Sequence, residues 1–153
     1  MMVLPAGFMD FLVMAKRNTY AGNSGRRDPL FPGALQLEFA DGGFLYRDIY
    51  YGSLFFVGQE VVHSMGLPIW SMSYSGGIVG LNADSGHIYT FLKSALLNPD
   101  PKLPIRGPDM FQSQGLHYEN SAVGEIEKFY GTERILKNSE TVYTMRYSGG
   151  MIK

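Results

Sequence analysis

Residues Gly58–Val79 read GQEVVHSMGLPIWSMSYSGGIV, and residues Gly131–Ile152 read GTERILKNSETVYTMRYSGGMI. The second stretch lies 73 positions after the first, and the two align without a gap. Seven positions are identical: Gly58/Gly131, Glu60/Glu133, Met72/Met145, Tyr74/Tyr147, Ser75/Ser148, Gly76/Gly149 and Gly77/Gly150. An internal repeat constrains the architecture before any local feature is assigned, so the chain is expected to contain two copies of one unit.

Each copy has the pattern of a long β-hairpin with a two-residue turn, at Met65-Gly66 and at Asn138-Ser139. If pairing continues regularly from these turns, one face carries the aromatic and methionine row with its cross-strand neighbours. In the first copy this face is Trp70, Met72 and Tyr74 with Phe55, Val57, Gln59 and Val61, and in the second it is Tyr143, Met145 and Tyr147 with Lys128, Tyr130, Thr132 and Arg134. We expect this row, the two methionines above all, to be buried.

The same regular pairing places Glu60 and Glu133 on the opposite, more polar face, as solvated strand glutamates. A three-residue turn would reverse the faces and bury both side chains. The Tyr-Ser-Gly-Gly segments are interpreted as a turn or bulge where two backbones approach closely.

The remaining elements repeat in the same order. An amphipathic helix is predicted over residues 7–18, with Lys16 outside its apolar stripe, followed by a turn-rich loop over 21–33 and strands over 35–39 and 44–51. A second helix is expected to begin at Asp84 or Ser85 and to run to about Leu97. The predicted fold is α+β, with two tandem α-β-β-β-β repeats over about 7–79 and 84–152. Antiparallel sheet(s) pack with two helices about a pseudo-two-fold axis, in one domain over 1–153.

Composition excludes several classes of function. The chain has no cysteine and a formal net charge of −1, which leaves no disulfide, no thiolate chemistry and no basic excess for direct nucleic-acid binding. No segment reaches the roughly 18 apolar residues that a membrane span requires, so we expect a soluble cytoplasmic protein without a membrane partner. His63, His87 and His117 have no metal-ligand spacing, and no cofactor motif is present.

The candidate ligand-binding residues are polar or aromatic positions on the predicted inner strands. They are Tyr46, Arg47, Asp48, Trp70, Tyr74, Arg134, Tyr143 and Tyr147. Arg47 has two interpretations: it holds a carboxylate ligand, or it pairs with Asp28 or Glu38. A catalytic protein would need an acid and a base with separated pKa values in a pocket. The groups available for that chemistry are Asp48, Glu60, His117 and Glu133.

Several motifs resemble the bacterial domain-of-unknown-function family numbered 5680. The first half carries Phe11-Leu12-x-x-Ala15-Lys16, Tyr46-Arg47-Asp48-x-Tyr50-x-Gly52, Phe56-x-Gly58-Gln59-Glu60 and Pro68-Ile69-Trp70-x-Met72-x-Tyr74. The second half carries Arg106-Gly107-Pro108, Gly131-x-Glu133 and Gly149-Gly150-Met151-Ile152-Lys153. The resemblance implies a domain found alone or C-terminal to an XRE-type helix-turn-helix domain, and it implies no catalytic residue.

Three functions are therefore expected, in this order. The first is a non-catalytic module of a bacterial regulatory system that senses a small-molecule effector in the cleft between the two copies. The second is a protein-interaction or homodimerisation module that uses a sheet edge or an aromatic patch. The third is a small enzyme with a carboxylate acid or base.

Overall fold

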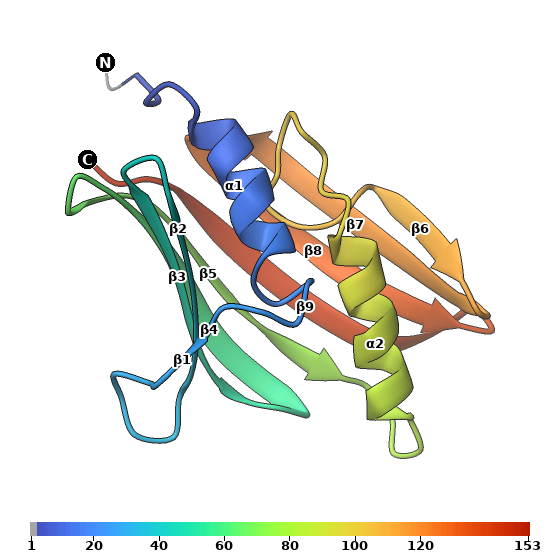
Figure 1. The fold of residues 1–153 in the computed structure, drawn as a ribbon. Helices are drawn as coiled ribbons and strands as arrows, with labels where there is room; N and C mark the ends of the chain where they lie inside the picture. Colours follow the sequence, from blue (N-terminus) through green and yellow to red (C-terminus); the bar gives the residue numbers. More distant parts are fainter. Residues whose placement is uncertain (1–2) are drawn as a thin grey trace.

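The computed structural model describes residues 3–153, which form an α+β fold with two helices and nine strands (Figure 1). The helices are α1 (Phe8–Arg17) and α2 (Ser85–Leu96). The strands of the first half are β1 (Arg26–Arg27), β2 (Leu35–Asp41), β3 (Phe44–Gly52), β4 (Phe55–Ser64) and β5 (Leu67–Ile78). Those of the second half are β6 (Met110–Ser113), β7 (Leu116–Glu125), β8 (Lys128–Lys137) and β9 (Glu140–Met151). Both predicted helices are confirmed, and the Asp84 side chain caps α2 by accepting a hydrogen bond from the His87 backbone N–H at 3.1 Å.

All nine strands form one antiparallel sheet in the order β1-β2-β3-β4-β5-β9-β8-β7-β6. The two copies therefore join edge to edge, through the pairing of β5 with β9. At this seam Tyr74 lies opposite Tyr147, which is its equivalent in the repeat. Because the two copies pair through equivalent residues on antiparallel strands, the repeat is related by an approximate two-fold axis that passes between these two tyrosines.

The seam requires glycine in both copies. A Cβ atom on Gly76 would lie 2.3 Å from the Thr144 backbone oxygen, and one on Gly149 would lie 2.2 Å from the Ser71 backbone oxygen. Close approach of two backbones, expected from the Tyr-Ser-Gly-Gly segments, is confirmed. The glycines lie within β5 and β9, so the segments form no turn.

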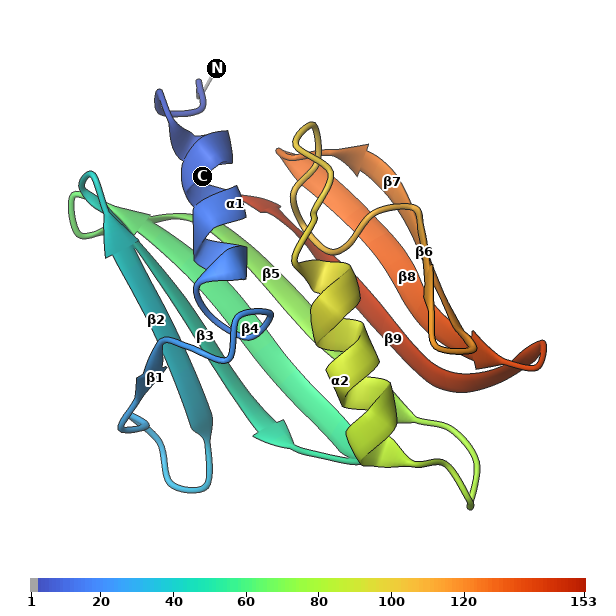
Figure 2. The same cartoon turned by 45° about the vertical axis from the view of Figure 1, so that its right-hand side comes forward.

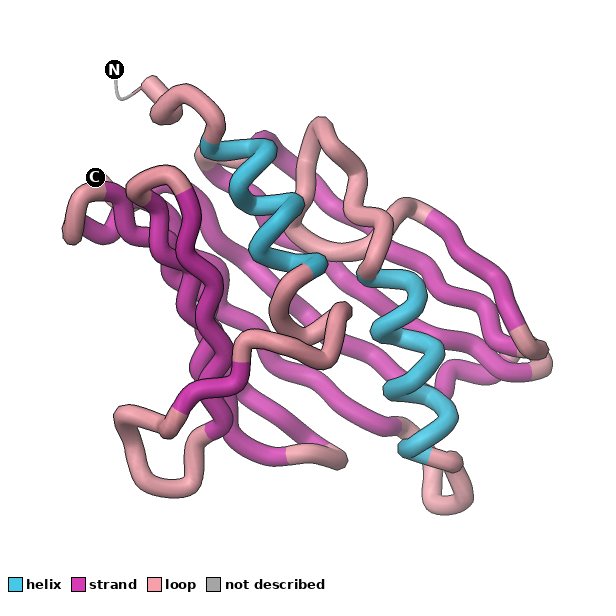
Figure 3. Tube along the Cα trace, viewed as in Figure 1, coloured by secondary structure: helices cyan, strands magenta, loops and turns pink. Residues whose placement is uncertain are grey.

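Both helices pack on the same face of the sheet (Figures 1 and 2). The core lies between the helices and the sheet. It includes Trp70, Met72 and Tyr74 with their equivalents Tyr143, Met145 and Tyr147. The predicted burial of this row is confirmed. Trp70 joins the two halves, since its ring stacks on Phe129 with centroids 5.7 Å apart and its Nε1 donates to the Ile126 oxygen at 3.2 Å. The loop over 97–109 lies on the helix-bearing side as well (Figure 3).

The hairpin turns have the predicted length, but the strand pairing after them does not continue regularly. Ser64 pairs with Leu67 across Met65-Gly66, and His63 pairs with Pro68. Val62 then pairs with Trp70, which leaves Ile69 as an extra residue in a β-bulge.

The second hairpin has the same irregularity, because Leu136 pairs with Thr141 and Ile135 with Tyr143, leaving Val142 over. One extra residue moves every later side chain of a strand to the other face relative to its partner. The predicted faces of β4 and β8 are therefore wrong, while those of β5 and β9 are as predicted. Glu60 pairs with Met72 and Glu133 with Met145, and both glutamates are buried.

The same correction moves the predicted neighbours of the aromatic row outward. Val57, Gln59, Lys128, Tyr130 and Arg134 lie on the outer face of the sheet and are exposed. Phe55, Val61 and Thr132 lie on that face too, away from the helices. No helix among residues 3–153 is long and apolar enough to cross a membrane.

Candidate functional site

A cavity of about 260 Å³ lies between the two helices, the first half of the sheet, the neighbouring strand β9 and the loop over 97–109. Seven aromatic side chains line it: Tyr20, Tyr46, Tyr50, Phe56, Tyr74, Tyr89 and Tyr143. Five charged side chains line it as well: Lys16, Asp48, Glu60, Lys93 and Arg106. The cavity thus combines an aromatic wall with an unusual number of buried ionisable groups.

Lys16 on α1 and Glu60 on β4 form an ion pair inside the cavity, with side chains 8% and 2% exposed. The Lys16 ammonium also donates to the Ile105 backbone oxygen at 2.8 Å. Burial lowers the pKa of Lys16, and the Glu60 carboxylate opposes that shift. The pair is fixed from two directions, by the helix and by the loop over 97–109.

Lys16 was wrongly placed outside the apolar stripe of the first helix. It continues the row of Phe8 and Leu12 at a spacing of four residues, so it faces the sheet with them. This spacing was the available signal. The prediction was wrong because a charged side chain does not count toward an apolar stripe, although its spacing from Leu12 places it on the buried row.

Asp48 on β3 lies beside Glu60 on the same face of the sheet. Its side chain is buried, and its Oδ1 accepts a hydrogen bond from the Tyr74 hydroxyl at 2.6 Å. Burial raises the pKa of Asp48 to about 7, and the neighbouring charge of Glu60 acts in the same direction. Among residues 3–153 no lysine or arginine forms an ion pair with Asp48.

Glu133 on β8 is the centre of a second polar cluster, which is closed by its own partners. Arg106 binds the carboxylate with two hydrogen bonds, of 2.9 and 2.7 Å, and the hydroxyls of Tyr118 and Tyr143 donate at 2.6 and 2.8 Å. Burial raises the pKa of Glu133, but Arg106 and these hydrogen bonds together hold it below its ordinary value. Glu133 is thus a satisfied anion behind the cavity wall.

The repeat makes Asn120 the counterpart of Asp48. Asn120 pairs with Glu133 across β7 and β8, as Asp48 pairs with Glu60 across β3 and β4. Its Oδ1 accepts a hydrogen bond from Tyr147 at 2.6 Å, which reproduces the bond from Tyr74 to Asp48. A neutral amide therefore fills this structural position in the second copy, where the first copy carries a carboxyl group.

The cavity meets solvent at a rim of partly exposed residues from α2, the loop after α1 and the turn between β3 and β4. Tyr89 donates a hydrogen bond to the Ser53 backbone oxygen, and Lys93 donates one to Asn23. The Lys93 ammonium also lies 4.9 Å from the centre of the Tyr20 ring. These contacts tie three separate segments together around the opening.

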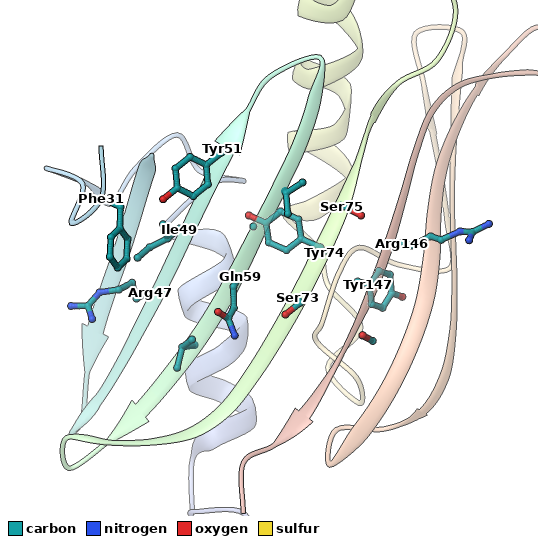
Figure 4. A pocket seen from close by; sticks show the side chains of 14 residues that line it. Phe31, Arg47, Ile49, Tyr51, Gln59, Ser73, Tyr74, Ser75, Arg146 and Tyr147 are labelled. Atoms are coloured by element: carbon teal, nitrogen blue, oxygen red, sulfur yellow. The ribbon is translucent and has the colours of Figure 1, made fainter. Parts of the chain in front are cut away.

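A second hollow, of about 690 Å³, lies on the outer face of the sheet over β3, β4, β5 and β9 (Figure 4). Arg47, Ile49, Gln59, Ser73 and Arg146 line it, and Phe31 lies at one side. It is an open trough over serine-rich strands rather than an enclosed space, because Gln59, Ser73 and Arg146 are all exposed.

The predicted site residues are divided between these places. Four line the enclosed cavity: Tyr46, Asp48, Tyr74 and Tyr143. Arg47 and Tyr147 line the outer hollow, which Tyr74 also reaches, whereas Trp70 and Arg134 line neither. The Arg47 guanidinium binds the Glu38 carboxylate at 2.8 Å, which is one of the two interpretations given for Arg47. Arg134 binds Glu119.

The remaining enzyme candidate, His117, lies on the outer side of β7, where its ring nitrogens contact Gln112 and Glu119. Among residues 3–153 no three histidine or carboxylate side chains are grouped as metal ligands. The enzyme hypothesis requires a carboxylate or histidine in a pocket, and the enclosed cavity supplies Asp48 and Glu60.

Arg106 is the lining residue that the sequence argument missed most completely. It lies in the loop over 97–109, outside every helix and strand, and it pairs with Glu133, whereas the equivalent Glu60 of the first copy pairs with Lys16 of α1. The available signal was the segment Arg106-Gly107-Pro108, which carries the family resemblance but has no helical or strand periodicity to place its side chains.

Comparison with protein families gives one match. The model of a family described as Domain of unknown function (DUF5680) matches residues 48–152, which begin within β3 and include all of the second copy. No curated protein and no solved structure matches the chain.

Proposed function

We propose that this chain, which belongs to the DUF5680 family, binds a small organic molecule in the cavity between α1, α2 and the first half of the sheet. The observation that supports the proposal is that a cavity lined by aromatic rings also contains a carboxyl group, Asp48, that forms no ion pair with a cation among residues 3–153. Ligand sites in proteins combine an apolar wall with a few polar groups that orient the ligand in this way.

The volume limits the ligand to a small molecule. Ligand sites range upward from roughly 300 Å³, and an apolar cavity of about 150 Å³ admits benzene. A cavity of about 260 Å³ therefore has room for one ring with a short polar arm. Larger effectors, such as a dinucleotide, do not fit.

The position of the cavity supports a sensing role. Its walls come from both helices, from β3 to β5, from β9 of the second copy, and from the loop over 97–109. A molecule bound there would stabilise the packing of the two helices against the sheet by mass action, since it binds the folded form alone. A regulatory partner would then respond to the position of the helices.

The proposal is tested by a thermal-shift screen of a broad library of small metabolites. A hit should raise the melting temperature of the wild type, and Ser53→Trp at the cavity rim should reduce the shift. Ser73→Trp, on the outer face, is the matched control and should leave the shift unchanged. If the outer-face substitution alone removes the shift, the ligand occupies the outer hollow and the proposal is wrong.

A second candidate function is self-association through the outer face of the sheet. Tyr51 pairs with Val57 and Val123 with Tyr130 across neighbouring strands, and all four side chains are exposed. These pairs are related by the repeat, so a two-fold surface with two apolar patches is available for a second copy. Light scattering on the wild type and on Val57→Lys tests it, and a monomer at high concentration would exclude it.

A further inference from the structure

Asp48 is the acidic group of the cavity that forms no ion pair with a cation among the described residues. Arg106 is neutralised by Glu133 through two hydrogen bonds, and Lys16 is neutralised by Glu60. Asp48 is left over. An ionised carboxylate buried without a counter-ion is costly, so this group either holds a proton or meets a positive charge from outside the chain.

We propose that the cavity is a site for a small organic cation, an aromatic or similarly compact amine, and that Asp48 is the residue that receives its positive charge. The inference rests on the proposed function, and it names the chemical class of the ligand.

The internal repeat supplies a control for the role of Asp48. In the second copy Asn120 accepts the same tyrosine hydrogen bond at the same distance, 2.6 Å, without a charge. The fold therefore does not need a carboxyl group at this position. Asp48 lines the cavity, whereas Asn120 does not. Of these two equivalent positions, the one that a ligand can reach therefore carries the ionisable side chain.

The aromatic wall suits the same ligand class. Tyr46, Tyr50 and Phe56 line the cavity near Asp48, and the faces of aromatic rings attract cations. The Lys16 ammonium illustrates this within the protein, since it lies 5.8 Å from the centre of the Tyr46 ring. A ligand ammonium would find the carboxylate and the ring faces together, while its apolar part replaces water against the remaining wall.

Binding of a cation should be linked to release of the Asp48 proton. The groups facing Asp48 are Glu60 from β4, Tyr74 from β5, Lys16 from α1, Arg106 from the loop over 97–109, and Tyr46 and Tyr50 from its own strand. Lys93 lines the same cavity from α2. With a pKa of about 7, Asp48 is mostly protonated at pH 5.5 and mostly ionised at pH 8. Because the ionised fraction sets the apparent affinity, cation binding should tighten roughly 30-fold over this interval.

The experiment uses three probes of one shape and three charges: benzylamine, benzyl alcohol and benzoate. Calorimetric titration of the wild type at pH 8 should give benzylamine an affinity about tenfold or more above that of benzyl alcohol, as expected for a charge-assisted hydrogen bond. Asp48→Asn should remove this preference and the pH dependence while retaining binding of benzyl alcohol. Asp10→Asn, the same change on an exposed position of α1, should retain both.

Three results would overturn the inference without touching the proposed function. The first is tighter binding of benzoate, because Lys16 and Arg106 would then select the charge. The second is an amine preference that persists in Asp48→Asn. The third is failure of all three probes while the hits of the metabolite screen carry no positive charge. If the metabolite screen also gives no hits, the proposed function itself is wrong. If the hits of the screen are cations that Asp48→Asn no longer binds, the inference is supported.

Discussion

Replacing Asp48 by asparagine should stabilise the protein at pH 8, although it alters a buried side chain in the middle of a polar cluster. Burial and the charge of Glu60 raise the pKa of Asp48 from 3.8 to about 7. The folded state therefore binds a proton more tightly than the unfolded state does. The stability that this proton provides is fully present below pH 3.8, and it is lost as the pH rises through 7.

The magnitude follows from the size of the shift. Each pKa unit corresponds to about 1.4 kcal/mol, so a rise from 3.8 to about 7 costs the wild type up to about 4 kcal/mol above pH 7. Asparagine has no proton to lose. It can also keep the hydrogen bond from Tyr74, since Asn120 accepts the equivalent bond from Tyr147. For a chain of 153 residues, 2–4 kcal/mol corresponds to a rise in melting temperature of roughly 5–10 °C.

The assay is urea unfolding of the wild type and Asp48→Asn at a series of pH values between 4 and 8. The difference in unfolding free energy between the two proteins should widen with pH by up to about 4 kcal/mol. Asn120→Asp provides the reciprocal test, because it should introduce a new loss of stability over the same interval. A difference between wild type and Asp48→Asn that stays constant with pH would refute the reasoning, since Asp48 would then titrate alike in both states.

The other predictions concern the closed cluster, the seam and the core. Glu133→Gln leaves the Arg106 charge without a carboxylate, and it should lower the unfolding free energy by about 3–5 kcal/mol in the same assay. Gly76→Ala should lower it by about 1–3 kcal/mol, because the new methyl group meets the backbone of β9, whereas Gly86→Ala within α2 should raise it by about 0.5–1 kcal/mol. Met145→Ala should cost about 2–5 kcal/mol, and a loss below 1 kcal/mol would show that the core collapses around the gap.

The sequence alone was sufficient for the two-fold plan of the molecule. Its repeat predicts two helices, two hairpins with two-residue turns and an α+β fold, because turn residues and hydrophobic periodicity act over a few neighbouring residues. The burial of Trp70, Met72 and Tyr74 follows from the same local pattern. Half of the predicted site residues, Tyr46, Asp48, Tyr74 and Tyr143, line the cavity.

The tertiary structure decided which faces of β4 and β8 turn inward. One extra residue, Ile69 in the first hairpin and Val142 in the second, reverses the pairing and buries Glu60 and Glu133. Nothing local to the hairpins requires a bulge there. The inward register becomes favourable only when Lys16 and Arg106 arrive from distant segments to neutralise the two carboxylates, and such long-range pairing cannot be read from spacing along the chain.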